Sequence, residues 1–319
     1  MEFRLIDRIR ERTAQLREDV RLGIGDDAAL LTVPLGQELA VAIDTLVGGV
    51  HFPHDTAPAD IGWKALAVNL SDLAAMGAAP AWALLALTLP QVDPARVDGL
   101  AEGFAQLARE YGVALVGGDT TRGPFCLSVA VHGFVPPGQA LTRAGACVGD
   151  AVFVTGTLGD AAGGLRLALG ERPFDPADEA HRMLRARLDR PIPRVRAGLA
   201  LRGFANACID VSDGLLADLG HLCAASGVGV EIDADALPLS PASCTVFGEG
   251  PARELALAGG DDYELCFTVP PARIAAMQAA LDGQGCRVTR IGRVVEGQGV
   301  SLAGGGPAPQ RRGWDHFPG

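Results

Sequence analysis

The chain has 319 residues, of which 48% are hydrophobic, with 42 glycines and few aromatic residues. This composition is typical of a globular protein with a large core and many turns, organised as one large or two medium-sized domains, and it excludes a disordered chain. The formal net charge of −11 argues against nucleic acid or an anionic membrane as a partner.

Cysteine usage and hydropathy indicate the compartment. The seven cysteines form no C-x-x-C pair and most lie in apolar runs, so we expect reduced, buried thiols in a reducing environment. The N-terminal residues carry charges throughout, and no apolar stretch reaches membrane-spanning length without polar breaks. These features predict a soluble, cytoplasmic protein that is not exported.

The first half of the chain is predicted to alternate helices with short strands. The helices are predicted over residues 2–12, 58–76 and 94–111, and the strands over residues 39–43 and 82–89. The helix 58–76 is apolar on nearly all sides, which predicts that it is buried. The strand 39–43 is predicted to deliver Asp44 at its end.

A glycine-rich stretch, residues 117–123, follows an apolar run and precedes another. This pattern predicts a strand, a tight loop and a second strand. In such a loop Asp119 could reach a metal ion and Arg122 could reach a phosphate. A plain polar hairpin loop is the alternative interpretation.

The second half begins after Pro136-Pro137-Gly138, which is the best candidate for a domain boundary. Residues 172–194 are rich in Arg, Pro and Asp and predict an exposed, irregular excursion, and residues 212–214 are predicted to cap the helix that follows. Strands are predicted over residues 151–155, 207–211, 228–232, 265–269 and 287–291, and helices over residues 251–258 and 271–281. The predicted fold class is α+β, with domains at residues 1–137 and 138–319.

Acidic residues recur at strand ends and helix starts, beside Gly, Ser or Thr. They are Asp26, Asp27, Asp44, Asp72, Asp119, Asp210, Asp213 and the cluster at residues 261–264. Two carboxylates ~4 Å apart repel by about 4 kcal/mol at an effective dielectric constant near 20. If these acids converge, divalent cations must neutralise them, and all-oxygen ligands favour Mg²⁺, which shares its coordination shell with phosphates.

A nucleotide is therefore expected, although the usual motifs for one are absent. The sequence has no P-loop and no protein-kinase signature. Lys64 is the only lysine. Phosphate charge would then be met by Arg122, Arg143, backbone N–H groups and the metal ions.

The ordered set of motifs resembles the thiamine-monophosphate kinase family, within the aminoimidazole-ribotide synthetase-like ATP-binding superfamily. The resemblance spans almost the whole chain in the right order. It is carried by Gly23-Ile24-Gly25-Asp26-Asp27-Ala28, residues 44–47 with His51-Phe52, residues 69–77, 117–123, 154–156, 209–215 and 259–265, and the tail 314–317.

The resemblance implies an enzyme that phosphorylates thiamine monophosphate with ATP to give thiamine diphosphate. It implies a homodimer in which the N-terminal sheet joins its twin in a dimeric β-barrel, and a C-terminal α/β domain that completes the ATP and substrate site. The implied ligands of several Mg²⁺ ions are Asp27, Asp44, Asp72, Asp119 and Asp210, with Asp213 holding a further ion. The implied ATP contacts are Tyr111, Gly118, Asp119, Arg143 and Ser212, and the implied substrate contacts are His51, Asp261 and Trp314 or Phe317.

Two positions depart from the family pattern. Where the family often has hydroxyl residues before Asp44, this chain has Ala42 and Ile43, so the backbone carbonyl of Ile43 would have to replace a side-chain ligand. The family commonly has Glu where this chain has Asp261, and the shorter side chain predicts a looser or water-mediated substrate contact.

The expected reaction is in-line transfer of the γ-phosphoryl group to a phosphate oxygen, which needs no general base because that acceptor is mostly ionised at neutral pH. The alternatives are another ATP-using synthetase of the superfamily, a Mg²⁺-dependent phosphohydrolase and a non-catalytic nucleotide sensor. A selenophosphate-type synthetase would require a reactive cysteine near the N-terminus, whereas the first cysteine here is Cys126.

Several candidate residues also have a purely structural interpretation. His51 could be a structural or surface histidine, and Tyr111 could be ordinary packing. Trp314 could seal the C-terminus onto the core, Asp26 could cap a turn beside Asp27, and Asp72 could be a cap or part of a buried ion pair.

Overall fold

The structure is a computed structural model that describes residues 2–304, 309 and 313–314. The chain divides into two compact units. The N-terminal unit comprises Met1–Leu73 and Ala78–Gly138, and the C-terminal unit comprises Ala74–Gly77 and Gln139–Gly319. Each unit combines one principal sheet with helices, so α+β describes both.

The N-terminal unit is built on a four-stranded sheet that forms an open half-barrel. Its strand order is β3 (Glu38–Val47), β6 (Cys126–Val135), β4 (Ala79–Leu89) and β5 (Ala114–Arg122). Strand β6 is antiparallel to both neighbours, whereas β4 and β5 are parallel. The parallel pair is connected through a helix, as a crossover requires.

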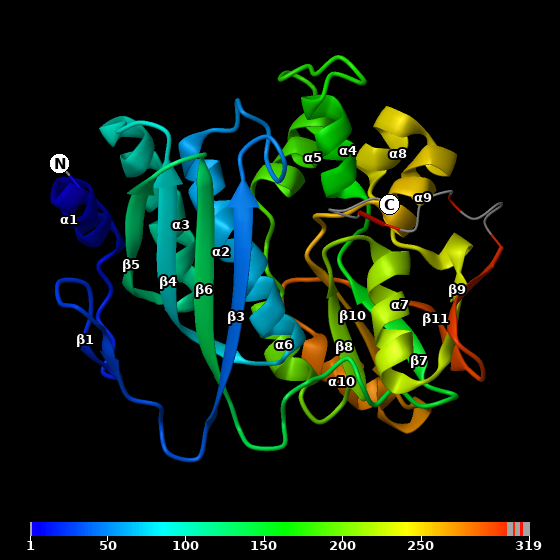
Figure 1. Ribbon diagram of the computed structural model, residues 1–319. Coiled ribbons are helices and arrows are strands. Elements are labelled where there is room, and N and C mark those ends of the chain that lie inside the picture. The colour runs from blue at the N-terminus through cyan, green and yellow to red at the C-terminus, as the bar shows by residue number, and fades with distance from the viewer. Residues whose placement is uncertain (1, 305–308, 310–312, 315–319) are drawn as a thin grey trace. The chain divides into compact units, whose positions relative to one another are not determined.

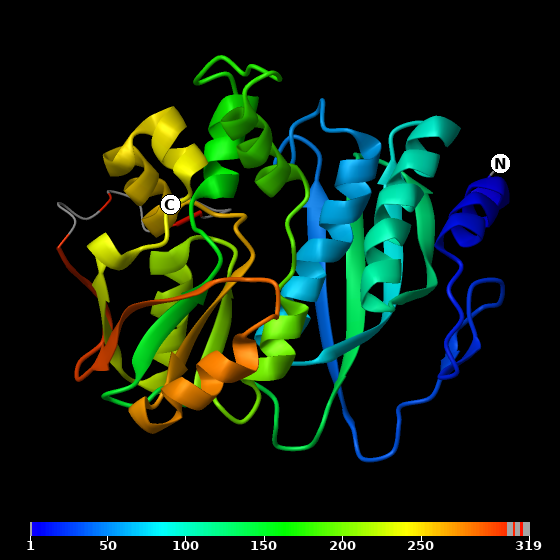
Figure 2. The same cartoon turned by 180° about the vertical axis from the view of Figure 1, so that it is seen from behind.

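Two helices, α2 (Pro58–Ala75) and α3 (Pro94–Tyr111), cover one face of this sheet (Figure 2). Helix α3 begins at Asp93, whose carboxylate accepts hydrogen bonds from the N–H groups of Ala95 and Arg96, and it ends at the left-handed residue Gly112. The two helices pack closely, since a Cβ atom added at Gly103 of α3 would lie 1.7 Å from the carbonyl oxygen of Ala59 in α2.

The opposite face of this sheet is partly bare (Figure 1). The hairpin of β1 (Val20–Leu22) and β2 (Leu30–Leu31) packs on one end of it, against Trp82 and Phe134. Beyond the hairpin, large apolar side chains remain exposed; they are Leu39, Val41, Ile43 and Leu84. Helix α1 (Glu2–Thr13) lies beside α3, and Arg8 of α1 pairs with Asp98 of α3.

The C-terminal unit is built on a six-stranded sheet. Its strand order is β12 (Gly299–Ala303), β9 (Gly229–Asp233), β11 (Val288–Val295), β7 (Ala151–Thr155), β10 (Glu264–Val269) and β8 (Ala207–Val211). Only the pair β12–β9 is parallel. Every residue of β7, β8 and β10 is buried, so both faces of the sheet centre are covered.

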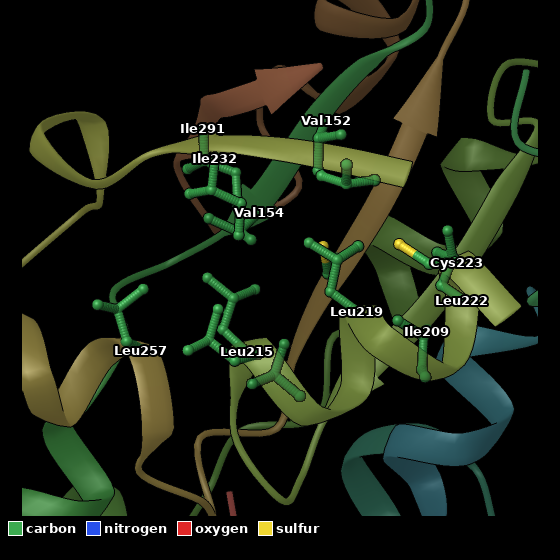
Figure 3. Packing of buried hydrophobic residues seen from close by; sticks show 14 of the residues in the cluster. Val152, Val154, Ile209, Leu215, Leu219, Leu222, Cys223, Ile232, Leu257 and Ile291 are labelled. Carbon is green, nitrogen blue, oxygen red and sulfur yellow. The ribbon is translucent and has the colours of Figure 1, made fainter. Parts of the chain in front are cut away.

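Helix α7 (Leu215–Ser226) covers one face of this sheet with Leu215, Leu219, Leu222 and Cys223 (Figure 3). These side chains meet a layer from the strands that consists of Val152, Val154, Ile209, Ile232 and Ile291. The remaining helices of this unit are α4 (Asp160–Ala168), α5 (Glu179–Asp189), α6 (Val195–Leu201), α8 (Pro241–Phe247), α9 (Glu249–Ala258) and α10 (Ile274–Leu281), with short 3₁₀ turns at Ala234–Ala236 and Pro271–Arg273.

Several sequence-based predictions about elements were wrong. Asp44 lies within β3 and not at its end, because pairing with β6 continues to Val47. The expected loop at residues 117–123 is mostly strand, because β5 pairs with β4 as far as Arg122. Helix α8 and strand β12 were not predicted.

The excursion expected at residues 172–194 contains helix α5, whose Leu184 and Leu188 are buried. Helix α7 begins after Gly214, which lies within the predicted cap at residues 212–214, but no side chain caps it, and the carboxylate of Asp218 in its first turn accepts from the N–H groups of those three residues. All seven cysteines are free, but only Cys208, Cys223 and Cys266 are buried. None of the helices among the described residues has the length and hydropathy to cross a bilayer.

Candidate active site

In the N-terminal unit, Asp44 and Asp72 are brought together through helix α2. The side-chain oxygen of Asn69 accepts a hydrogen bond of 2.9 Å from the backbone N–H of Asp44. Asp72 lies three residues further along α2, on the same helical face as Asn69. Both carboxylates are half-buried, so the edge strand β3 and helix α2 present two acidic groups to one region.

Asp119 lies on β5, directly after Gly117 and Gly118 of the glycine-rich stretch. Gly118 is required sterically, because a Cβ atom there would lie 1.9 Å from the carbonyl oxygen of Leu85 on β4. The close approach of β4 and β5 therefore sets the backbone that carries Asp119, whose side chain is exposed.

Asp44 and Asp119 lie on opposite edge strands of the sheet. Asp44 pairs with Val129, which is buried under the helices, whereas Asp119 is in register with Ala86 and Ser128, which belong to the bare face. Three strand spacings separate β3 from β5, or about 14 Å along the sheet. The two carboxylates of one chain therefore point to different faces and are too far apart to bind one ion together.

The remaining metal candidates of this unit lie at exposed positions. Asp26 accepts a hydrogen bond of 2.8 Å from the N–H of Asp27, so Asp26 caps its own turn and Asp27 is the better candidate ligand. Ile43 directs an exposed apolar side chain to the bare face, which leaves its backbone carbonyl as its only possible metal ligand.

His51 has a defined ring orientation in the loop before α2. Its Nδ1 accepts a hydrogen bond of 2.9 Å from the N–H of Val47, so the hydrogen of a neutral ring lies on Nε2. The ammonium group of Lys64, which is 1% exposed, donates to the carbonyl oxygen of His51 at 3.1 Å. The loop is thus fixed from both sides, and the edge of the ring that carries Nε2 can donate a hydrogen bond.

Two further predicted residues of this unit lie near strand or helix ends. Tyr111 is the last residue of α3 and is half-buried. Arg122 ends β5 and, with Thr120 and Thr121, lines a cleft of about 570 Å³. The other walls of the cleft are Leu5 and residues 89–92.

In the C-terminal unit, Asp210, Asp213 and Asp218 concentrate negative charge between β8 and α7. Asp218 is buried and accepts three backbone hydrogen bonds. Burial, and then the charges of Asp210 and Asp213, nevertheless raise the pKa of Asp218 to about 7. Such an excess of negative charge would be relieved by a bound cation.

The other predicted residues of this unit lie close to this acidic loop or are exposed. Ser212 is half-buried in the loop between Asp210 and Asp213. The N–H of Trp314 donates to the carbonyl oxygen of Asp213 at 2.9 Å, and its side chain is 52% exposed, so the ring does not seal the C-terminus. Arg143 is exposed, and Phe317 lies outside the described residues.

Asp261 is joined to the same loop, because its backbone N–H donates to the carbonyl oxygen of Ser212 at 2.8 Å. The next residue, Asp262, is buried and accepts hydrogen bonds from the N–H groups of Gly159 and Ala161 at the start of α4. Burial raises the pKa of Asp262 well above its ordinary value, although these hydrogen bonds oppose the shift.

Sequence reasoning missed the polar network behind Asp261. Glu264 is fully buried and binds Arg187 at 2.6 Å and Arg194 at 2.5 and 2.6 Å. Burial works to raise the pKa of Glu264, but the hydrogen bond and charge of Arg194 and the charge of Arg187 outweigh it, so this pKa is lowered. Arg187 and Arg194 lie 77 and 70 residues before Glu264 in the chain, so a local sequence pattern does not reveal these pairs.

The donor set fits Mg²⁺ in its chemistry, because the candidates are carboxylate oxygens. Within residues 2–304 and the short described parts of the tail, however, no three His, Cys, Asp or Glu side chains are grouped to hold a metal ion. Since the candidates are divided between the two units and between two faces of one sheet, the full ligand set stays a prediction.

Comparison with known proteins covers nearly the whole chain. Residues 25–135 match the family model of the AIR synthase related protein N-terminal domain, and residues 148–305 match that of the C-terminal domain. The thiamine-monophosphate kinase of Salmonella typhimurium is 47% identical over 319 residues, which covers 99% of this chain and 98% of the relative.

Solved structures give the same result. The crystal structure of thiamine-monophosphate kinase from Stenotrophomonas maltophilia K279a is 53% identical with a TM-score of 0.87, covering 93% of this chain and 95% of that one. A structure described as AaThiL complexed with AMPPCP and TMP is 35% identical with a TM-score of 0.80, covering 99% and 97%. The chain therefore belongs to the thiamine-monophosphate kinase family, among the AIR synthase related proteins.

Proposed function

We propose that this chain transfers the γ-phosphoryl group of ATP to thiamine monophosphate and so forms thiamine diphosphate. The observation that carries the proposal is 47% identity to a thiamine-monophosphate kinase over the full chain. A structural relative with a TM-score of 0.80 is described as a complex with AMPPCP and TMP. AMPPCP has the triphosphate shape of ATP, which supports ATP as the co-substrate.

Several Mg²⁺ ions would be held by carboxylates of both units. The proposed ligands are Asp27, Asp44, Asp72, Asp119, Asp210 and Asp213, with the backbone carbonyl of Ile43. When bound, such ions neutralise phosphate charge and hold the reacting oxygens in line. The raised pKa of Asp218 beside Asp210 and Asp213 supports a cation there.

The protein itself contributes binding and orientation. The acceptor phosphate has a second pKa of about 6, so at neutral pH it is mostly ionised and needs no general base. What the side chains must supply is alignment of two anionic reactants. The proposed ATP contacts are Tyr111, Gly118, Asp119, Arg143 and Ser212, and the proposed substrate contacts are His51, Asp261, Trp314 and Phe317.

The active form of the enzyme is proposed to be a homodimer in the cytoplasm. Leu39, Val41 and Ile43 are 43%, 59% and 66% exposed on one strand, and such a row of apolar side chains is typical of a protein interface. A second copy of the half-barrel would cover this face and close an eight-stranded barrel. Both edge strands, with Asp44 on β3 and Asp119 on β5, would then border the partner subunit.

In this proposal the two parts of the chain have different tasks. Residues 1–137 provide the dimer contact and most of the metal ligands, and residues 138–319 complete the ATP and substrate site. The Asp210–Asp213 loop, with the backbone of Trp314 and Asp261 bound to it, supports the second task.

The test is formation of thiamine diphosphate from ATP, Mg²⁺ and thiamine monophosphate, with thiamine itself as the control acceptor. We expect product from the monophosphate only. ATP consumption without any thiamine compound would instead indicate a Mg²⁺-dependent phosphohydrolase. Consumption only with a different phosphorylated or carboxylated acceptor would indicate another ATP-using synthetase, and binding without consumption would indicate a nucleotide sensor.

A further inference from the structure

Residues 261–263 form a turn with an uncommon backbone. Asp261 has φ of 70° and Tyr263 has φ of 51°, and among the described residues these are the only non-glycine residues with positive φ. Asp tolerates this region, but for a bulky residue such as Tyr it is an outlier that costs about 1 kcal/mol or more. The fold must therefore hold the turn in place.

Contacts on both sides of the turn hold it. The N–H groups of Asp261 and Tyr263 donate to the carbonyl oxygens of Ser212 and Val211, each at 2.8 Å. Asp262, between them, is buried and accepts from the N–H of Gly159 at 2.6 Å. Glu264 directly follows and is fixed by its two arginines. The backbone conformation of Asp261 and Tyr263 is thus over-determined.

The turn brings the side chains of Asp261 and Tyr263 into hydrogen-bonding contact. The Tyr263 hydroxyl donates to Oδ1 of Asp261 at 3.0 Å. The Tyr263 residue is 8% exposed, so the hydroxyl is presented from a ring that packing has already immobilised. Asp261 itself is half-buried.

We propose that Tyr263 is a positioning residue, whose hydroxyl fixes the Asp261 carboxylate in the direction that receives the thiamine part of the substrate. This inference rests on the proposed function, in which Asp261 contacts that substrate. A carboxylate suits the amino group and the cationic ring of thiamine, because it accepts hydrogen bonds and carries the opposite charge. Holding one oxygen of the carboxylate limits its rotation before substrate arrives, which reduces the entropy lost on binding.

The test is the variant Tyr263→Phe, which removes the hydroxyl and keeps the buried ring. We expect KM for thiamine monophosphate to rise about 5- to 10-fold, the effect of losing one hydrogen bond of typical net strength, while KM for ATP and the melting temperature stay near wild type. The matched control is Thr268→Val on strand β10, which follows the turn, because the buried Thr268 hydroxyl has no partner among the described residues and its loss should change neither KM.

A double-mutant cycle with Asp261→Ala separates the two proposals. If Tyr263 acts through Asp261, adding Tyr263→Phe to Asp261→Ala changes KM for thiamine monophosphate no further. Additive effects, an unchanged KM in Tyr263→Phe, or an equal rise in both KM values would overturn the positioning role. Asp261→Ala with a wild-type KM would instead overturn the proposed substrate contact.

A crystal structure of Tyr263→Phe gives a readout that does not depend on the reaction. The expected result is that the Asp261 carboxylate occupies more than one rotamer while residues 259–264 keep their backbone. A single unchanged rotamer would show that the hydroxyl does not orient Asp261, even if the wild-type chain proved to act on a different substrate.

Discussion

In the N-terminal unit, Asp44 and Asp119 lie on the two edges of a sheet that has one bare face. In the C-terminal unit, Asp262 and Glu264 lie inside the protein, and every contact they need comes from the same unit. The contrast separates carboxylates that hydrogen bonds hold inside one unit from carboxylates that lie on the edges of a sheet. The first kind stabilises the protein, and the second kind is where a cation and a second subunit would act.

The largest effect is expected from Val41→Asp, which places a charge on the bare face of the four-stranded sheet. Val41 is 59% exposed on β3. Burying an unpaired carboxylate against a second apolar face costs several kcal/mol, so the proposed dimer should separate into monomers and kcat/KM should fall by about 100-fold or more. Sedimentation velocity and the coupled kinase assay measure the two effects.

The control for this variant is Leu35→Asp, because Leu35 is fully exposed in the turn between β2 and β3. It adds the same charge to the same unit away from the sheet. Neither the oligomeric state in sedimentation velocity nor the activity should change. A Val41→Asp protein that stays dimeric and active would show that the bare face is not the subunit interface.

The next effect concerns the carboxylates that are proposed to bind Mg²⁺. Asp72→Asn removes the charge next to the Asn69–Asp44 contact, and we expect turnover to fall about 100-fold together with weaker Mg²⁺-dependent ATP binding. Asp55→Asn, an exposed residue before α2, is the control. Kinetics that remain unchanged at limiting Mg²⁺ would remove Asp72 from the metal ligands.

Glu264→Gln tests the other kind of carboxylate, which is buried inside the C-terminal unit. It replaces the charged partner that Arg187 and Arg194 share inside the unit by a neutral amide, so the free energy of unfolding should decrease by about 3–5 kcal/mol. Glu231→Gln breaks the exposed pair with Arg293 and should cost less than about 1 kcal/mol. Urea denaturation measures the decrease in the free energy of unfolding for both variants. Equal small decreases would show that the buried network does not stabilise the fold.

The smallest effect is a pH dependence from His132, which lies on the bare face of β6 beside Trp82. Burial lowers the pKa of His132 below its ordinary value of 6.5. The folded protein therefore keeps a neutral ring under conditions where the unfolded chain binds a proton, and stability decreases as the pH falls from 7 toward 5.

His132→Asn removes this titration, so its free energy of unfolding should vary less over that pH range, by about 1 kcal/mol at most. The exposed His221 on α7 gives the control His221→Asn, which should keep the wild-type slope. If the free energy of unfolding changes with pH equally in wild type and His132→Asn, His132 does not contribute to the pH dependence.

Much of the fold could be predicted from the sequence because local signals were strong. Helix α3 agrees with its predicted bounds because Pro94 and Gly112 mark its ends, and β7 and β8 agree because short apolar runs are bounded by Gly, Asp and Ser. Residues 117–122 were misassigned because two glycines indicate a loop, whereas pairing with β4 makes them a strand. That pairing is set by a distant segment and not by local propensity.

The candidate site was predictable in residue type but not in arrangement. The sequence identified Asp44 and Asp119, but strand order decides that they lie on opposite edges. Similarly, Arg187 and Arg194 belonged to a stretch that appeared exposed, and only the tertiary fold pairs them with Glu264. The role of Tyr263 depends on a left-handed backbone that its residue type argues against.

The only lysine of the chain, Lys64, is almost wholly buried and is held by the carbonyl oxygen of His51. Amine-reactive labels and cross-linkers consequently have no lysine target on the surface, and acylating enzymes have none to modify. Labelling and cross-linking of this protein should use guanidinium-selective or carboxyl-activating reagents, or maleimide coupling through the exposed thiol of Cys147.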